Sequence, residues 1–391
     1  MLVVVVASIA TERALPMALV VAGILTLVRW ITKGGLFIRT PLDWPILGLV
    51  TMAGISLLVT PRMDLTVPQV GRLLLGIAFF YSMVDWTTTQ ARLQIVLWGL
   101  ASAGLVLCVG APFGVNWELA RYKSSLIPQS IYDRFVLLGT DTINPNVMAG
   151  YLALLIPCII TSLLFEWSQP GYTRKALYAL VVFAMTIVLI LTQSRAGLLA
   201  ASAGIAASLI LRSGRIHCIP GLFIIIAILI GFFLVQMAGT EDLNKRLELW
   251  SRGWYILQYF AITGIGMGSF PYITEQLYPM VLQETLPHSH NLFLQVAIDL
   301  GIPGLIAWLV VLTLVIKAAW QTYQRTMRTQ VTTLAGFAAG ILGAQVALTV
   351  HGMFDAVTWG MVRPAVLVWG IWGAAIALEQ VSLPKLPSPQ R

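Results

Sequence analysis

Long apolar runs separated by short polar stretches make up most of the chain. Most runs are close to the length of about 20 residues that a helix needs to cross ~30 Å of hydrocarbon. The pattern predicts twelve membrane segments, at residues 2–11, 15–32, 43–60, 67–86, 92–110, 144–165, 174–192, 196–212, 218–237, 302–320, 330–350 and 361–379. We therefore expect an all-α polytopic integral membrane protein with about 12 transmembrane helices, forming a single membrane domain over residues 1–391.

Two long polar stretches, residues 111–143 and 238–301, separate these runs. The second is rich in Trp, Tyr and Leu, and residues 247–260 predict a helix with aromatic side chains at the depth of the membrane interface. We expect this stretch to form a large, partly helical loop that carries candidate site residues.

A short helix is predicted at residues 291–300, followed by a break at Gly301-Ile302-Pro303-Gly304. A continuous helix would place Asp299 inside the hydrocarbon, at a cost of about 2.5–3.5 kcal/mol. The glycine-rich segment Gly264–Phe270 lacks the preceding strand and following acid of a dinucleotide site, so a tight turn is expected there.

The composition supports a membrane protein and excludes several other classes. The chain is 58% hydrophobic and 10% charged, whereas a soluble protein is about 25% charged. The three cysteines show neither metal-ligand spacing nor a disulfide framework. The net charge of +8 is typical of Lys and Arg on cytoplasmic loops, and we predict no nucleic-acid partner. The first apolar run has no basic residue before it, so we expect a short first helix and not a cleaved leader.

The basic residues orient the predicted helices. One side carries 13 of the 24 Lys and Arg residues and is assigned to the cytoplasm. Nine of the 11 on the other side are arginine, whose planar fork suits phosphate and carboxylate oxygens. This orientation predicts a multi-pass protein of the bacterial inner membrane with both long loops, and the site, facing the periplasm.

His290, in the sequence His288-Ser289-His290-Asn291, is the first candidate site residue. An imidazole accepts a proton from a hydroxyl at neutral pH, which makes His290 a candidate general base. The alternative is an interfacial histidine bonded to the backbone. His288 is interpreted as a helper or a bystander. Two histidines without a cysteine or carboxylate pair are too few ligands for a metal, so no metal and no cofactor are predicted.

Four arginines are candidate cations of the site. Arg246 shares a helical face with Trp250 and Trp254, and is interpreted either as a phosphate clamp or as a residue that reaches lipid headgroups. Arg252 lies in the same cluster. Arg195, in a tight turn between two apolar helices, is a candidate partner of an anionic substrate. Arg72, near the outer end of its helix, is interpreted either as a cation that lines a cavity or as a residue that reaches lipid headgroups.

Two polar motifs at predicted helix ends remain. Asn146 follows Asn144-Pro145 at the start of a span, and is expected to cap the helix or to make a polar contact. His351 and Asp355 lie four residues apart at a helix end and are expected to pair with each other.

Several of these motifs together resemble the O-antigen ligase/polymerase superfamily of bacterial membrane glycosyltransferases. They occur in the family's order over about residues 140–360: Asn144-Pro145-Asn146, Thr192–Gly197, Arg246–Trp250 with Gly264–Phe270, His290-Asn291 followed after nine residues by Gly301-Ile302-Pro303-Gly304, and His351–Asp355. The first 110 residues match only in hydropathy.

The resemblance implies a metal-independent, inverting transfer of a glycan from undecaprenyl pyrophosphate. Arg195 and Arg246 would hold the pyrophosphate, and His290 would activate or orient the acceptor hydroxyl. We further predict that Arg72, Arg252, His288, Asn146 and Asn291 bind substrate. The acceptor would be a lipid A core sugar (ligase), another glycan repeat (polymerase) or a protein serine, and the sequence leaves these open. A membrane transporter, like the relatives linked to inorganic carbon, and a lipid-binding scaffold remain as alternatives, although neither paired half-helices nor a row of buried acids supports transport.

Overall fold

A computed structural model describes residues 15–121, 123, 127–137, 142–165, 171–214, 221, 241–277, 288–359 and 365–383. No strand occurs among these residues, and their extended structure is limited to a single bridge between Val115 and Ile143. The helices are α2 (Leu15–Lys33), α3 (Asp43–Val59), α4 (Met63–Trp86), α5 (Gln90–Gly114), α6 (Glu118–Arg121), α7 (Gln129–Tyr132), α8 (Pro145–Phe165), α9 (Tyr172–Leu191), α10 (Arg195–Ser213), α12 (Glu241–Tyr259), α13 (Phe270–Leu277), α14 (Leu292–Arg328), α15 (Thr332–Gly352) and α16 (Ala365–Ser382).

Nine of the described helices are long and apolar enough to cross a membrane, and α3 is apolar but shorter. These ten helices coincide with ten of the predicted segments. The other two, at residues 2–11 and 218–237, lie outside the described part of the chain except for residue 221. The all-helical membrane fold is therefore confirmed, whereas the number twelve is not.

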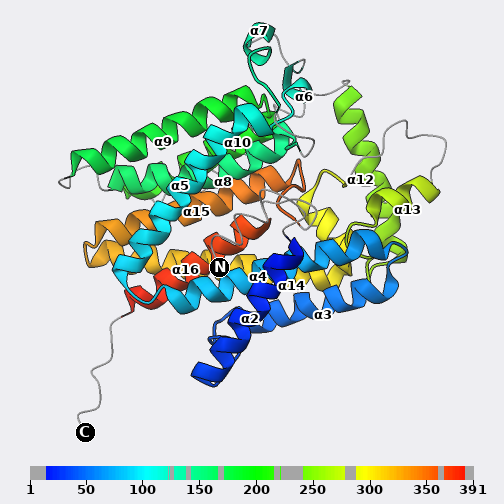
Figure 1. The fold of residues 1–391 in the computed structure, drawn as a ribbon, viewed down its shortest axis with the longest axis horizontal. Helices are drawn as coiled ribbons and strands as arrows, with labels where there is room; N and C mark the ends of the chain where they lie inside the picture. Colours follow the sequence, from blue (N-terminus) through cyan, green and yellow to red (C-terminus); the bar gives the residue numbers. More distant parts are fainter. Residues whose placement is uncertain are drawn as a thin grey trace.

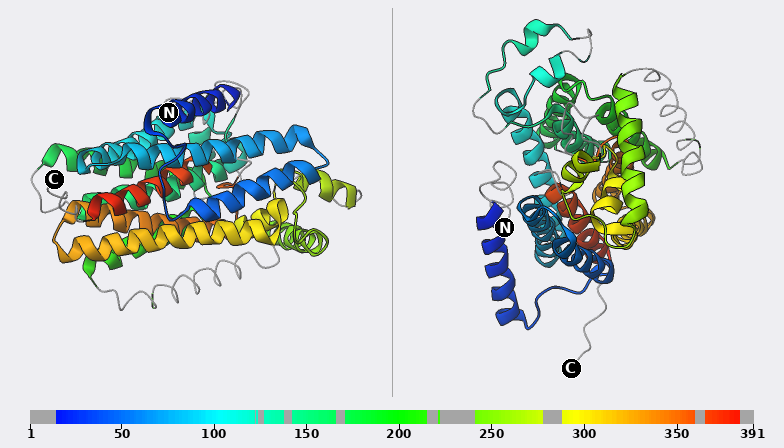
Figure 2. Two further views of the ribbon diagram at one scale, coloured as in Figure 1. Left: turned by 90° about the horizontal axis from the view of Figure 1, so that it is seen from below. Right: turned by 90° about the vertical axis from the view of Figure 1, so that its right-hand side faces the viewer.

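Most of the long helices run side by side, whereas α2 lies across them at the edge of the bundle (Figures 1 and 2). The helices α6, α7, α12 and α13 gather at one end of the bundle (Figure 1). We call this the loop end. Seen from that side, α12 crosses in front of the bundle (Figure 2, right). Helices α8, α10 and α14 begin at the loop end, and α9 and α15 finish there.

Close helix contacts through small residues hold α8, α10 and α15 together. A Cβ atom at Gly340 of α15 would lie 2.8 Å from Cys158 Cα on α8, and one at Gly204 of α10 would lie 2.6 Å from the carbonyl oxygen of Gly343. Small residues let backbones approach in this way where lipid gives no hydrophobic drive to associate.

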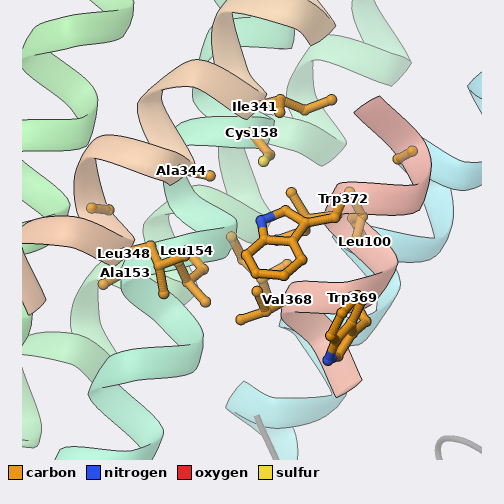
Figure 3. Close-up of a cluster of buried hydrophobic side chains, with 14 of the residues drawn as sticks. Leu100, Ala153, Leu154, Cys158, Ile341, Ala344, Leu348, Val368, Trp369 and Trp372 are labelled. Atoms are coloured by element: carbon orange, nitrogen blue, oxygen red, sulfur yellow. The ribbon is translucent and has the colours of Figure 1, made fainter. Parts of the chain in front are cut away.

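Larger side chains fill the space between α8, α15 and α16. The indole of Trp372 lies among Leu154, Cys158 and Val368 in this cluster (Figure 3). Its N–H donates to Gln345 Oε1 at 2.9 Å, so the buried polar atom has a partner. Cys108 and Cys158 are free and buried, whereas Cys218 lies outside the described residues.

The predicted break after residue 300 is present. Gly301 has φ 72° and ψ 176°, which separates a short helical segment from the long span inside α14. A Cβ atom at Gly301 would lie 2.3 Å from the carbonyl oxygen of Ile262, and the carbonyl of Ala261 accepts the Ile302 N–H at 2.7 Å. Only glycine adopts this conformation readily against so close a backbone.

The glycine-rich segment after α12 forms a turn, as predicted. Gly264, Gly266 and Gly268 all have positive φ, between 67° and 94°. The turn is fixed to α3 by a hydrogen bond from Met267 N to Ser56 Oγ (2.7 Å). It packs against the short helical segment before the break and helps to enclose the loop end.

Candidate active site

Two short segments meet at the loop end: residues 288–291, which lead into α14, and residues 353–359, which follow α15. Asn291 begins α14 as its N-cap, because its Oδ1 accepts the Leu294 N–H at 3.0 Å. Its Nδ2 donates to the carbonyl of Met353 at 3.3 Å. Asn291, predicted to bind substrate, therefore uses its amide to join the two segments.

His290 lies directly before this cap in a left-handed conformation, with φ 51°. This region is uncommon for a residue with a side chain and persists where surrounding contacts hold it. The His290 N–H donates to His288 Nδ1 at 3.2 Å, and the His288 and His290 rings meet edge to face with centroids 4.4 Å apart. The backbone thus turns both imidazoles toward one place.

The carboxylate of Asp355 faces both rings. Its Oδ1 lies 3.5 Å from His288 Nε2 and 3.5 Å from His290 Nδ1. Burial alone would raise the pKa of Asp355, but the contact with His290 and the neighbouring imidazoles outweigh burial and hold that pKa well below its usual range. Asp355 is therefore an anion at neutral pH, aimed at His290 Nδ1.

His288 is buried and neutral at pH 7, because burial lowers its pKa to about 4. Its Nδ1 accepts a hydrogen bond, so its single proton is on Nε2, the atom that faces Asp355. The neutral ring can donate this proton toward the carboxylate. This contact is compatible with the predicted role of His288 as a helper, which stays a prediction.

The same three residues have the spacing of metal ligands. One nitrogen from His288, one from His290 and one oxygen of Asp355 lie within 4.8 Å of one another. A metal at His288 Nε2 would require that nitrogen to lose its proton while Nδ1 still accepts a hydrogen bond. The hydrogen-bond pattern therefore favours a proton-sharing triad over a metal centre.

Arg246 reaches this cluster from α12. Its half-buried guanidinium donates to the carbonyl of Phe354, the residue before Asp355, and its charge acts on His288 and His351. One predicted cation and both predicted histidines thus share one site. Arg252, six residues later on the same helix, is 4% exposed and pairs with Glu248. The described contact of Arg252 is thus within α12, and its predicted role in substrate binding stays a prediction.

Arg195 lies at the same end of the bundle, and is the exposed first residue of α10. Gly197 packs on Ala149 of α8, and the next residue, Gly150, packs on the His351 ring. The start of α10, which carries Arg195, therefore packs on the part of α8 that also contacts His351. The described contacts do not bring the Arg195 guanidinium into direct contact with His290.

The turn before Arg195 is tight, as predicted. Gln193 has φ 50° and donates to the hydroxyl of Tyr132 at 2.8 Å, and that hydroxyl donates to the carbonyl of Leu191. Ser194 caps α10, with its Oγ accepting the Gly197 N–H. The polar segment that contains α7 thus holds the position of Arg195.

Asn146 makes a polar contact and does not cap α8. Asn144 Oδ1 accepts the Asn146 N–H at 2.8 Å, so Asn144 is the cap, with Pro145 at the first helical position. Asn146 Oδ1 accepts from Lys123 Nζ at 2.9 Å. Arg72 lies half-buried in α4, one turn after Gln69, which contacts the glycine turn at Gly268.

One expectation at the site is wrong. Asp355 was expected to pair with His351, but it faces His288 and His290, and its only bond to His351 is from the Asp355 N–H to the His351 carbonyl. Both ring nitrogens of His351 lack a hydrogen-bond partner among the described residues. The four-residue spacing failed as a guide because α15 ends at Gly352, before Asp355.

The family model for O-antigen ligases matches residues 180–309, which include Arg195, Arg246, His288 and His290. No curated protein matches the chain. The match supports glycosyl transfer of the O-antigen ligase or polymerase kind, with a lipid-linked glycan and an acceptor as substrates in general. Together with the apolar helices it fits a multi-pass bacterial membrane protein. Residues 180–309, about a third of the chain, are therefore similar to the O-antigen ligase family.

Proposed function

We propose that the protein transfers a glycan from undecaprenyl pyrophosphate to an acceptor hydroxyl at the periplasmic face of the inner membrane, with inversion and without a metal ion. The catalytic region would span residues 140–360, with residues 238–301 as a periplasmic loop that carries part of the site. The observation that carries this proposal is the meeting of Asp355, His290 and Arg246 at the loop end.

The pair of Asp355 and His290 supports general-base chemistry. With its Nδ1–H directed to Asp355, His290 presents Nε2 as a proton acceptor, and the carboxylate stabilises the imidazolium that forms. Sugar hydroxyls are weak nucleophiles, and removal of their proton by a positioned base is worth about 10²–10⁴-fold in rate. The acceptor oxygen then attacks the anomeric carbon as the bond to pyrophosphate breaks.

The arginines support departure of the pyrophosphate. Arg246 lies beside the Asp355 segment, and Arg195 is exposed at the same end of the bundle. Preplaced guanidinium groups stabilise the negative charge that develops on the leaving group, more strongly in a water-poor site than in water. Arg72, Arg252, His288 and Asn146 stay candidate binding residues around this centre.

A product assay in proteoliposomes tests the proposal. The protein is supplied with labelled glycan on undecaprenyl pyrophosphate and either lipid A core or excess repeat units. A single addition indicates a ligase, and a ladder of repeats indicates a polymerase. His290→Ala is expected to lower transfer by about 10²–10⁴-fold while the labelled donor still binds. Undiminished transfer by this variant would refute the base role, and loss of transfer with EDTA would refute the metal-free mechanism.

A further inference from the structure

One buried carboxylate, Asp299, joins three segments of the loop end. Its Oδ2 accepts from Trp359 Nε1 at 2.9 Å, and Trp359 lies in the segment that carries Asp355. Its Oδ1 accepts from Gln295 Nε2 at 2.9 Å and from the Gly268 N–H of the glycine turn at 3.4 Å. Asp299 is 1% exposed, so these donors take the place of water.

The amide of Gln295 extends this network to the histidines. Its Oε1 accepts the Ser289 N–H at 2.8 Å, and Ser289 is the residue between His288 and His290. Gln295 and Ser289 are both buried. Asp299 therefore contacts the Asp355 segment through Trp359 and the histidine segment through Gln295.

The backbone at Ser289 sets the direction of the Gln295 amide. The Ser289 N–H can only donate, so Oε1 of Gln295 must face it and the NH₂ group of Gln295 faces Asp299 Oδ1. An asparagine at position 299 keeps only one oxygen, so its NH₂ group faces either the Trp359 N–H or the NH₂ group of Gln295. In both orientations a donor faces a donor. A buried unpaired N–H is costly, so the segment would shift.

We propose that Asp299 and Gln295 are positioning residues, which set the place of His290 relative to Asp355. The inference rests on the proposed function, because it assigns a catalytic task to His290. The strained backbone of His290 follows the peptide that Gln295 holds. A displacement of about 1 Å at a catalytic group lowers a rate by about 10²-fold, so small losses of support have measurable effects.

The decisive experiment exchanges the two side-chain chemistries. Asp299→Asn directs two amides at each other, and Gln295→Glu directs two carboxylates at each other. Each single variant is expected to lower kcat for glycan transfer by about 10- to 100-fold, with KM for the donor changed by less than about 3-fold. In the double variant, the carboxylate of Glu at position 295 accepts from the Ser289 N–H, and the amide of Asn at position 299 donates to that carboxylate. This variant should recover at least about 10-fold of the lost kcat.

A matched pair of tryptophans separates positioning from packing. Trp359→Phe removes the donor to Asp299, whereas Trp372→Phe removes the donor to Gln345 in the interior of the bundle. Only Trp359→Phe is expected to lower kcat. Equal losses in both variants, or single variants at positions 295 and 299 with unchanged kcat, would overturn the inference.

Hydrogen exchange gives a readout that does not depend on transfer. The amide of Ser289 should exchange faster in Asp299→Asn than in the wild type, and at the wild-type rate in Trp372→Phe. Absence of this difference would overturn the inference even if the variants fold poorly in other assays. If the wild type itself transfers no glycan, the proposed function fails, while the exchange result still decides whether Asp299 holds the Ser289 peptide.

Discussion

The interior of the bundle and its loop end are held together by different chemistry. Between α8, α10 and α15, glycines let backbones approach so closely that a Cβ at Gly340 would lie 2.8 Å from Cys158 Cα. At the loop end the contacts are polar: Asp355 faces His288 and His290 at 3.5 Å, and Arg246 donates to the carbonyl of Phe354. The interior therefore fixes the helices, and the loop end places reactive groups on that fixed frame.

Asp355→Asn gives the largest expected effect on function and little effect on folding. An amide in place of the carboxylate no longer stabilises a charged His290 and can favour the wrong tautomer, so kcat for glycan transfer should fall by about 10²–10⁴-fold. Steady-state transfer in proteoliposomes measures this. The control is Asp85→Asn, which breaks an ion pair with Arg29 and Lys33 outside the site and should leave kcat unchanged.

Gly340→Val tests the interior. The new side chain would overlap the α8 backbone, and we expect destabilisation of several kcal/mol and a clear loss of folded protein. The control is Gly54→Val on α3, where a Cβ meets nothing within 4 Å. Size-exclusion yield and thermal unfolding in detergent compare the two. A Gly340→Val protein with wild-type stability would contradict the close packing of α8 and α15.

Arg246→Lys tests whether the arginine fork matters at the loop end. Lysine keeps the charge but loses the planar pair of donors, so affinity for the lipid-linked donor should fall by about 10-fold. Arg325→Lys, at the other end of α14, breaks a bond to Ser382 Oγ and serves as the control. Titration with labelled donor measures both, and equal affinity in the Arg246→Lys variant would argue against a phosphate contact.

His288→Asn gives the smallest effect, on the pH dependence of stability. Burial lowers the pKa of His288 to about 4 from 6.5, so the unfolded chain binds the proton first as pH falls. The wild type should lose on the order of 1–2 kcal/mol between pH 7 and pH 5, and the loss should continue toward pH 4. Asparagine removes this titration, so the melting temperature of the variant should depend less on pH in that window.

The charged and titratable groups near His288 are Asp355, His290, His351 and Arg246. Asp355 has a lowered pKa and becomes protonated only well below pH 4, so it contributes at lower pH than His288. The difference between the melting curves at pH 7 and pH 5 is therefore diagnostic. Identical pH dependence in the wild type and His288→Asn would show that His288 is not held neutral.

The helices and the two glycine-dependent features could be predicted from the sequence, because they depend on local chemistry. Hydropathy located the ten spans that fall within the described residues, and Gly301 with Pro303 located the break in α14. The partner of Asp355 could not be predicted, since it depends on how α14 and α15 pack across more than 60 residues of chain. His351, four residues away, satisfied the local rule and is not the partner. The sequence did contain one sign that Asp355 belongs to the site, because Asp355 lies in the segment His351–Asp355 that resembles the family. No second acidic residue accompanies it there, so the sequence alone did not pair Asp355 with His288 and His290.

The break at Gly301 also has a consequence for how the chain enters the bilayer. The part of α14 after the break is apolar enough to insert into the bilayer by itself, while the short helical segment before it carries the polar side chains of Gln295 and Asp299. These polar groups do not have to be threaded into lipid with the span that follows, because the helix axis is interrupted between them. The short helical segment before the break can then pack after the span has inserted, once the segments that contact Gln295 and Asp299 are in place.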